Sequence, residues 1–304
     1  MRRVIRSIKS GYADATGFVG FHVWRGLARC LGLGGFYPVA RAYYFCRAIL
    51  NEVSKRPFPR SEGPEWLQVD ESMRSRIRRR QRRYLNDLQR NFPDRIAEPK
   101  WRSRCRVEGL EYLRAAQAAG RPVVLAFFHF GPVYTLRQWV RAYGFPAAGY
   151  MGGDLESRGK LAQLQDRVTP FPEVPTIFFP DDLRAVMKFV KGGNILFMAV
   201  DSREGRQTTA EVEGGWTTKL NTGAARLAHG TGADLMLCSI VNEDFWRYRV
   251  KFSPPIPGES LGTEADLAEA NRRLLEAMLP DFKAYPDQFV LPIQWSRIQT
   301  ANQT

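Results

Sequence analysis

Residues 121–141, RPVVLAFFHFGPVYTLRQWVR, contain an apolar run that ends at a single histidine. Residues 123–128 are aliphatic or aromatic throughout, which is typical of a strand buried on both faces. Pro132 suits the first turn of a following helix. His129 is therefore predicted to lie at a strand-to-helix corner, outside the carboxyl end of a strand. In open α/β sheets this is where ligands tend to bind.

A histidine at such a corner has two interpretations. Its unperturbed pKa of about 6.5 allows a neutral imidazole to take a proton from a hydroxyl or an amine near neutral pH. It could equally cap a helix or satisfy a buried carbonyl group. Position alone leaves both open for His129.

The part of the chain after Cys105 alternates short apolar runs with amphipathic segments. The expected strands are residues 123–128, 147–151, 176–179, 194–200, 234–241 and 247–252. The expected helices are residues 109–119, 133–143, 181–191, 222–229 and 263–279. This alternation predicts an α/β fold with a mostly parallel central sheet flanked by helices.

The chain of 304 residues is long enough for one large α/β domain, or for one domain with a smaller appendage. Its four cysteines are scattered without short spacings, so neither a disulfide framework nor a thiolate metal site is indicated. The three histidines lie far apart in the sequence, and we expect no metal centre. Reduced cytosol is the expected environment.

A formal net charge of +14 indicates an anionic partner. Seven arginines fall within RSRIRRRQRRY, residues 74–84, and on a helix they would cover nearly every face. They suit anionic headgroups or an acidic carrier protein, unless they are simply a solvated helix. A nucleic acid partner is not expected, because no recognisable nucleic-acid-binding module accompanies the run.

Residues 17–50 are rich in aromatic and aliphatic side chains, but charged residues interrupt them. The longest uncharged stretch, residues 30–40, has 11 residues, whereas a spanning helix needs about 20. We expect two helices in or against the headgroup layer, broken at Gly34 and Gly35, after a basic amphipathic segment at residues 1–10. The alternatives are core helices and a frayed terminus. No signal peptide is recognisable.

Three regions follow from these patterns. Residues 1–52 are predicted to be membrane-associating helices. Residues 53–104 are predicted to be a basic helical connection. Residues 105–304 are predicted to form the α/β domain.

Four segments, in order, resemble the lipid A late acyltransferase family, the lauroyl and myristoyl transferases of the lysophospholipid acyltransferase superfamily. They are VEGLEYLRAAQAAGRPVVLAFFHFG (107–131), DSREGR (201–206), TKLNTGAARLAHGTGADLML (218–237) and YRVKFSPPIP (248–257). The resemblance implies transfer of an acyl chain from an acyl-carrier-protein or acyl-CoA thioester to a hydroxyl of a membrane lipid or glycolipid. No other cofactor is implied.

The resemblance makes His129 the general base and Gly131 a source of backbone N–H groups for the oxyanion. In the family motif a carboxylate stands at the fifth position after the histidine, where this chain has Tyr134. Three outcomes are open. Tyr134 orients the imidazole in a slower enzyme, a remote carboxylate does so, or the fold is retained without the reaction. Asp201, after the expected strand at 194–200, is the candidate remote carboxylate.

The loop that follows offers candidate substrate-binding residues, namely Arg203, Glu204 and Arg206. An arginine there suits a phosphate, and the alternative is an ordinary solvated loop. The leading hypothesis is an acyltransferase at the cytoplasmic face of the bacterial inner membrane, peripheral or monotopic, with a hydroxyl or an amine as the acceptor. The competing hypothesis is a catalytically silent relative that binds lipid or acyl chains as a scaffold.

Overall fold

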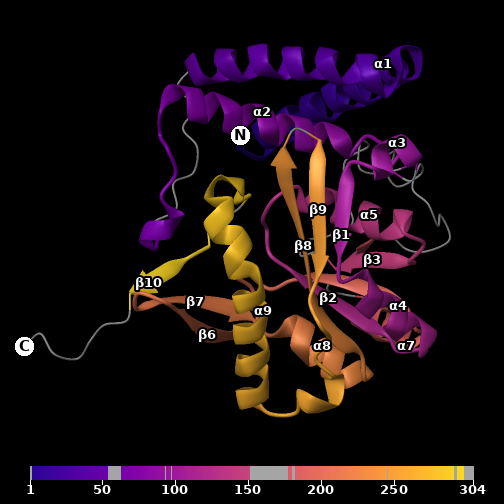
Figure 1. Ribbon diagram of the computed structural model, residues 1–304, viewed down its shortest axis with the longest axis vertical. Coiled ribbons are helices and arrows are strands. Elements are labelled where there is room, and N and C mark those ends of the chain that lie inside the picture. The colour runs from indigo at the N-terminus through magenta and orange to yellow at the C-terminus, as the bar shows by residue number, and fades with distance from the viewer. Residues whose placement is uncertain are drawn as a thin grey trace, which may run out of the picture.

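The computed structural model describes residues 2–53, 63–92, 94–96, 98–150, 177–179, 182–244, 246–290 and 293–297, with side chains from residue 19 onward. At its centre lies a seven-stranded sheet in the order β1-β9-β8-β2-β5-β3-β4 (Figure 1). Its strands are β1 (Cys105–Glu108), β2 (Val123–Phe127), β3 (Ala147–Tyr150), β4 (Ile177–Phe178), β5 (Ile195–Ala199), β8 (Asp234–Asp244) and β9 (Arg247–Phe252). All neighbours are parallel except β8 and β9, which confirms the mostly parallel α/β sheet.

Helices cover both faces of this sheet. The helices of the α/β region are α3 (Pro99–Arg102), α4 (Leu110–Ala118), α5 (Leu136–Ala142), α7 (Leu183–Lys191), α8 (Gly223–Thr231) and α9 (Glu264–Ala284). Short 3-10 turns are η1 (Glu65–Leu67), η2 (Val133–Thr135), η5 (Gly258–Ser260) and η6 (Pro286–Gln288). Along β2, Val123 and Leu125 enter the core with α4 and α5, whereas Val124 and Ala126 enter the core with α7, α8 and α9. The continuous apolar run is therefore buried on both faces, as predicted.

A second, three-stranded antiparallel sheet has no counterpart in the sequence-based prediction. It has the order β10-β7-β6, with β6 (Gln207–Val212), β7 (Trp216–Asn221) and β10 (Trp295–Arg297). Its strands are partly exposed, so they mix threonines and charged residues with few apolar ones. Such strands lack the continuous apolar run that marks a buried strand, which is why they were missed. Strand β1, short and charged, was missed for the same reason.

Helix α1 (Arg2–Val53) turns back on itself at Gly32, where φ is 60° and ψ is 178°. The ring centroids of Trp24 and Tyr44 lie 5.5 Å apart, although a straight helix would separate residues 20 positions apart by about 30 Å. The prediction of two helices is confirmed, but the predicted break at Gly34 and Gly35 is wrong. A helix tolerates glycine at a cost of about 1 kcal/mol, so glycine permits a break without forcing one.

Helix α2 (Met73–Gln89) lies between α1 and the end of the sheet where β8 ends (Figure 1). Phe36 of α1 is fully buried, and its ring centroid lies 5.4 Å from that of Phe92 and 5.5 Å from that of Trp246. The folded-back helix thus shares a core with the α/β region. None of the described helices combines the length and the apolar character needed to cross a membrane. Side chains of residues 1–10 lie outside the described part, so the amphipathic segment there stays a prediction.

Candidate active site

His129 follows β2 by two residues and is held in a tight loop. Its carbonyl oxygen accepts a hydrogen bond of 2.9 Å from the N–H group of Val290. The next residue, Phe130, donates its N–H to the carbonyl of Phe128 at 2.7 Å and forms a β-bridge with Phe289. Two chain segments far apart in sequence therefore fix the backbone of His129.

Asp201 reaches His129 from the neighbouring strand. Strands β2 and β5 are parallel, with Phe127 paired to Ala199, so both residues stand two positions beyond that last pair. The Oδ1 atom of Asp201 lies 2.7 Å from Nδ1 of His129. The Oδ2 atom accepts the backbone N–H of His129, also at 2.7 Å. The structure thus brings together the two residues that sequence reasoning paired from topology.

This double contact determines which nitrogen of the imidazole carries the proton. An ionised carboxylate only accepts hydrogen bonds, so Nδ1 must be the protonated nitrogen. The lone pair is then left on Nε2, which has no hydrogen-bond partner among the described residues. The His129 side chain is 20% exposed and that of Asp201 is 4% exposed, so the carboxylate is shielded while the imidazole reaches solvent. The pair has the geometry of a general base with an orienting carboxylate.

Gly131 has a structural role that differs from the expected one. Its N–H donates to the carbonyl oxygen of Gln288 at 2.9 Å, so this group is already used and does not face an oxyanion. The residue has φ of 65°, and an added Cβ would lie 2.0 Å from the carbonyl oxygen of Ile240. The predicted oxyanion contact from backbone N–H groups around Gly131 stays a prediction, and the N–H of Gly131 itself is not available for it. Glycine is required here because β8 comes so close.

The position of Tyr134 bears on its expected role. Its side chain is 49% exposed, and the guanidinium of Arg90 lies 5.0 Å from its ring centroid. No hydrogen bond joins it to His129 within the described part of the chain, and Nδ1 is already bound to Asp201. Of the three outcomes that the sequence left open, this contact favours the remote carboxylate, and a catalytic role for Tyr134 stays a prediction. Tyr134 lies in η2, and its ring contacts Arg90 at the C-cap of α2.

Three further candidates lie on the exposed loop between β5 and β6. The main-chain carbonyl of Glu204 accepts a hydrogen bond from Asn221, and that of Arg206 accepts the N–H of Thr222 at 2.9 Å. The loop backbone is thus anchored, and the side chains of Arg203, Glu204 and Arg206 are exposed close to Asp201 in sequence. Their substrate-binding role stays a prediction.

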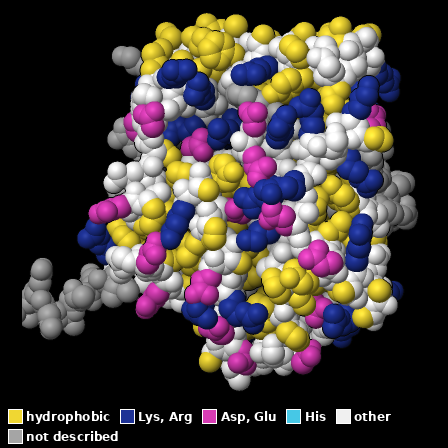
Figure 2. Space-filling view, viewed as in Figure 1, with side chains coloured by type: hydrophobic (Ala, Val, Ile, Leu, Met, Phe, Trp, Pro, Cys, Tyr) yellow, Lys and Arg dark blue, Asp and Glu magenta, His cyan; other side chains and the backbone are white. Residues whose placement is uncertain are grey.

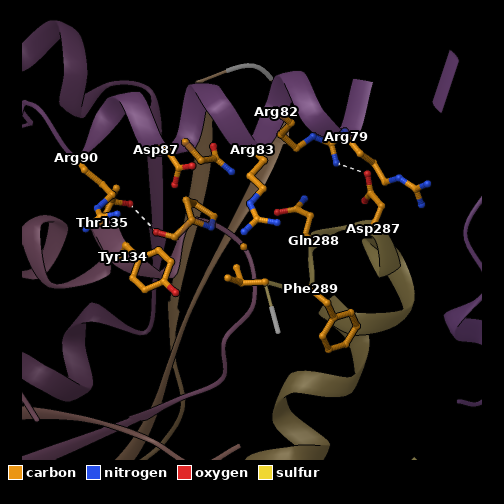
Figure 3. A pocket seen from close by; sticks show the side chains of 14 residues that line it. Arg79, Arg82, Arg83, Asp87, Arg90, Tyr134, Thr135, Asp287, Gln288 and Phe289 are labelled. Atoms are coloured by element: carbon orange, nitrogen blue, oxygen red, sulfur yellow. Dashed lines mark hydrogen bonds and ion pairs between the residues drawn. The ribbon is translucent and has the colours of Figure 1, made fainter. Parts of the chain in front are cut away.

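A pocket beside the His129 loop was missed by sequence reasoning. It lies between α2, the loop after His129 and the segment around η6, and Figure 3 shows its side chains. Its lining residues are Arg79, Arg82, Arg83, Asn86, Asp87, Arg90, Gly131, Pro132, Tyr134, Thr135, Asp287, Gln288, Phe289 and Val290. The spacing of the α2 members could have indicated one shared face, but not what lies opposite. The described residues contain no cluster of three or more His, Cys, Asp or Glu side chains that could hold a metal ion.

The fold and the contact between His129 and Asp201 define the class: an α/β protein with a histidine, oriented by a carboxylate, at the carboxyl edge of its sheet. Residues 93–291 match the family described as bacterial lipid A biosynthesis acyltransferase. The chain belongs to this family, and acyl transfer to a lipid acceptor is the activity that the family implies.

The structure resembles the crystal structure of the 1-acyl-sn-glycerophosphate (LPA) acyltransferase PlsC from Thermotoga maritima. The sequence identity is 12% and the TM-score is 0.44, over 90% of this chain and 98% of that chain. No curated protein matches the sequence.

Proposed function

We propose that this protein transfers a fatty acyl chain from an acyl-carrier-protein or acyl-CoA thioester to a hydroxyl of a membrane lipid or glycolipid. An amine is the alternative acceptor. The observation that carries the proposal is the contact of 2.7 Å between Nδ1 of His129 and Oδ1 of Asp201. Family membership supports the same class of reaction.

The geometry suggests how the proton moves. Nε2 of His129 takes the acceptor hydroxyl proton while the oxygen forms a bond to the thioester carbonyl carbon. The resulting imidazolium is stabilised by the carboxylate of Asp201, which stays ionised. When the carbon–sulfur bond breaks, the imidazolium returns the proton to the leaving thiolate. The products are an acylated acceptor and a free thiol.

Asp201 supplies the charge that the family motif places at the position of Tyr134. A neutral phenol could orient an imidazole but would not stabilise an imidazolium, so a carboxylate is the better partner for a general base. Its two oxygens bind both the ring and the backbone N–H of His129. The absence of a carboxylate at residue 134 is thus compatible with catalysis.

The surface of α1 supports peripheral attachment to a membrane. Most of the large hydrophobic side chains that are exposed in the described part of the chain lie on this helix: Val19, Val23, Leu31, Val39, Tyr43, Phe45, Leu50 and Val53. Figure 2 shows hydrophobic side chains along the edge over α1, with Lys and Arg side chains just below them. An apolar surface bordered by cations suits an anionic bilayer. We place the protein at the cytoplasmic face of the bacterial inner membrane.

The test is mass spectrometry of total lipids from cells that express the protein or its His129→Ala variant. We expect a lipid heavier by one acyl chain that is absent from the His129→Ala cells. His229→Ala is the matched control, because His229 is exposed and its Nδ1 contacts only the carbonyl of Gly258 among the described residues. The control should yield the same lipid as the unmodified protein.

A catalytically silent lipid-binding relative is the second candidate, favoured only by Tyr134 at the acid position of the motif. It predicts identical lipids in all three strains while the proteins remain on the membrane. That result would overturn the transferase proposal and select the scaffold.

A further inference from the structure

One face of α2 and its C-cap, Arg90, are polar along their whole length. The residues that line the pocket from this segment are Arg79, Arg82, Arg83, Asn86, Asp87 and Arg90. Their spacings of three and four residues put them on one side of the helix. A helix face directed at the body of a domain is usually apolar. This one carries four arginines, two of which form ion pairs, Arg79 with Glu71 and Arg82 with Asp287.

The rest of α2 is fixed in place by other contacts. Leu85 and Leu88 are buried, and Arg80 donates to Glu52 of α1 at 2.7 Å. Gln81 donates to the carbonyl of Arg41 at 2.7 Å. Because the helix is anchored to α1 by these residues, its pocket-lining arginines stand on a rigid support. Preorganised cations of this kind lose little entropy when they bind an anion.

The opposite wall of the pocket belongs to the candidate active site. Gly131, Pro132 and Tyr134 come from the loop that follows His129. Val290 lines the pocket and donates its N–H to the carbonyl of His129 at 2.9 Å. A ligand in this pocket would therefore contact the same loop that holds the candidate general base.

The charge of the pocket favours an anion. Four arginines and two carboxylates, those of Asp87 and Asp287, line it, and the guanidinium of Arg79 pairs at 3.3 Å with Glu71, which lies outside the pocket. Arg82 forms an ion pair with Asp287 at 2.6 Å, as Figure 3 shows, and the guanidinium of Arg83 extends toward Gln288. Arg90 stacks on Tyr134, which leaves the edge of its planar guanidinium for hydrogen bonds. One guanidinium group can donate two parallel hydrogen bonds to two oxygens of a phosphate group, so these arginines suit a phosphate ester.

We propose that this pocket binds a phosphate group of one of the two substrates and thereby places that substrate beside His129. The proposal rests on the proposed acyl transfer and adds a ligand class to it. The phosphate could belong to the headgroup of the lipid acceptor or to the phosphopantetheine arm of the thioester donor. Both are phosphate esters, and the kinetic experiment below separates them.

The first experiment measures binding of inorganic pyrophosphate to the full chain by calorimetry, without any acyl transfer. Arg83→Gln and Arg90→Gln should each weaken binding about tenfold, the loss expected for one charge-assisted hydrogen bond. Arg78→Gln is the matched control, because this arginine is exposed on the same helix and lies outside the pocket. It removes the same charge and should leave the Kd unchanged.

Equal weakening by all three variants would indicate attraction to the overall positive charge and would overturn the proposal. No detectable binding by the unmodified protein would overturn it as well. Neither result depends on turnover, so failure of the pocket is distinguishable from failure of the acyl transfer, which the lipid analysis of His129→Ala decides.

The second experiment separates the two sources of phosphate by steady-state kinetics. If the pocket binds the acceptor, Arg83→Gln and Arg90→Gln should raise the KM for the acceptor about tenfold, with a smaller effect on kcat and on the KM for the donor. If it binds the donor, the KM for the thioester should rise instead. Unchanged KM values for both substrates would overturn the proposal.

Discussion

The His129–Asp201 pair and the arginine pocket lie next to each other but are built differently. The pair stands on two adjacent parallel strands and is closed by two hydrogen bonds of 2.7 Å. The pocket joins a helix near the N-terminus to a segment near the C-terminus, and long cationic side chains line it. A rigid sheet edge suits proton transfer, which needs accurate geometry. An open, charged surface suits binding of a polar substrate.

The largest expected effect is the loss of kcat on replacing Asp201, a residue of the pair that does not line the pocket. The Asp201→Asn variant has one acceptor oxygen for two donors, the backbone N–H and the Nδ1–H of His129. The backbone N–H cannot change, so the amide NH2 group is forced to face Nδ1, and the proton moves to Nε2. We expect kcat to fall about 10⁴-fold, as a wrong tautomer does in a serine protease.

The measurement is a steady-state assay with radiolabelled thioester at saturating substrate, supported by circular dichroism of the purified variant. Glu211→Gln, which neutralises an exposed carboxylate on neighbouring β6, is the control and should retain full activity. Retention of kcat within a factor of about ten by Asp201→Asn would remove Asp201 from the mechanism.

Gln288 connects the two regions, so its replacement tests whether they are coupled. Its side chain donates to the carbonyl of Asn242 at 2.7 Å and accepts the N–H of Asn242 at 3.0 Å, while its main chain holds Gly131. Gln288→Met keeps the length of the side chain and removes both hydrogen bonds. We expect kcat to fall by about 10²-fold with a smaller change in KM, because the loop of His129 shifts slightly.

Thermal denaturation of Gln288→Met and of the unmodified protein shows how much stability the variant loses, for comparison with its loss of kcat. Two unpaired buried groups should cost about 1–3 kcal/mol each, and the variant should remain folded at assay temperature. If kcat stays unchanged while stability falls, Gln288 supports the fold only, and the two regions act independently.

A smaller effect is expected at Tyr134, where removal of the hydroxyl tests whether the phenol takes part in the reaction. Tyr134→Phe keeps the ring that contacts Arg90 and removes only the hydroxyl. Because Nδ1 of His129 is bound to Asp201, we expect kcat to change by less than about threefold. Steady-state rates at saturating substrate will measure this. A loss of about 10²-fold would restore the phenol to the mechanism, since that is the contribution expected of an acid–base group.

The smallest effect concerns how α2 is supported. Burial opposes ionisation of Glu52, but hydrogen bonds from Arg80 and Arg76 outweigh it and lower the pKa of this carboxyl. A carboxyl with a lowered pKa stabilises the fold above its unfolded pKa, about 4.3, and this stability is lost as the pH falls through the lower folded value. Glu52→Gln should therefore lower stability at pH 7 and show a smaller deficit in acid.

Urea denaturation of Glu52→Gln and of the unmodified protein, at pH 7 and again in acid, measures the difference in their free energies of unfolding. Glu211→Gln is the control for loss of an exposed carboxylate. A deficit that is the same at every pH would show that packing, and not ionisation, accounts for the role of Glu52.

Much of the central sheet could be predicted, because a continuous apolar run within a few residues is enough to indicate a strand buried on both faces. The run before His129 is apolar at every position, and strands buried on both faces have this pattern. The same reasoning located the strand before Asp201, since both residues follow apolar runs. The strands of the small antiparallel sheet carry no such signal, because they are partly exposed.

The remaining features depend on contacts between residues far apart in the chain. The sequence by itself determined that His129 and Asp201 stand at strand ends, because the continuous apolar run before each of them is a local feature. Only the tertiary structure decided that β2 and β5 are neighbours and that Gln288 occupies the N–H of Gly131. It also placed the arginine face of α2 opposite the segment at Asp287. Which segments pack together depends on the complementarity of whole surfaces, and no local pattern encodes it.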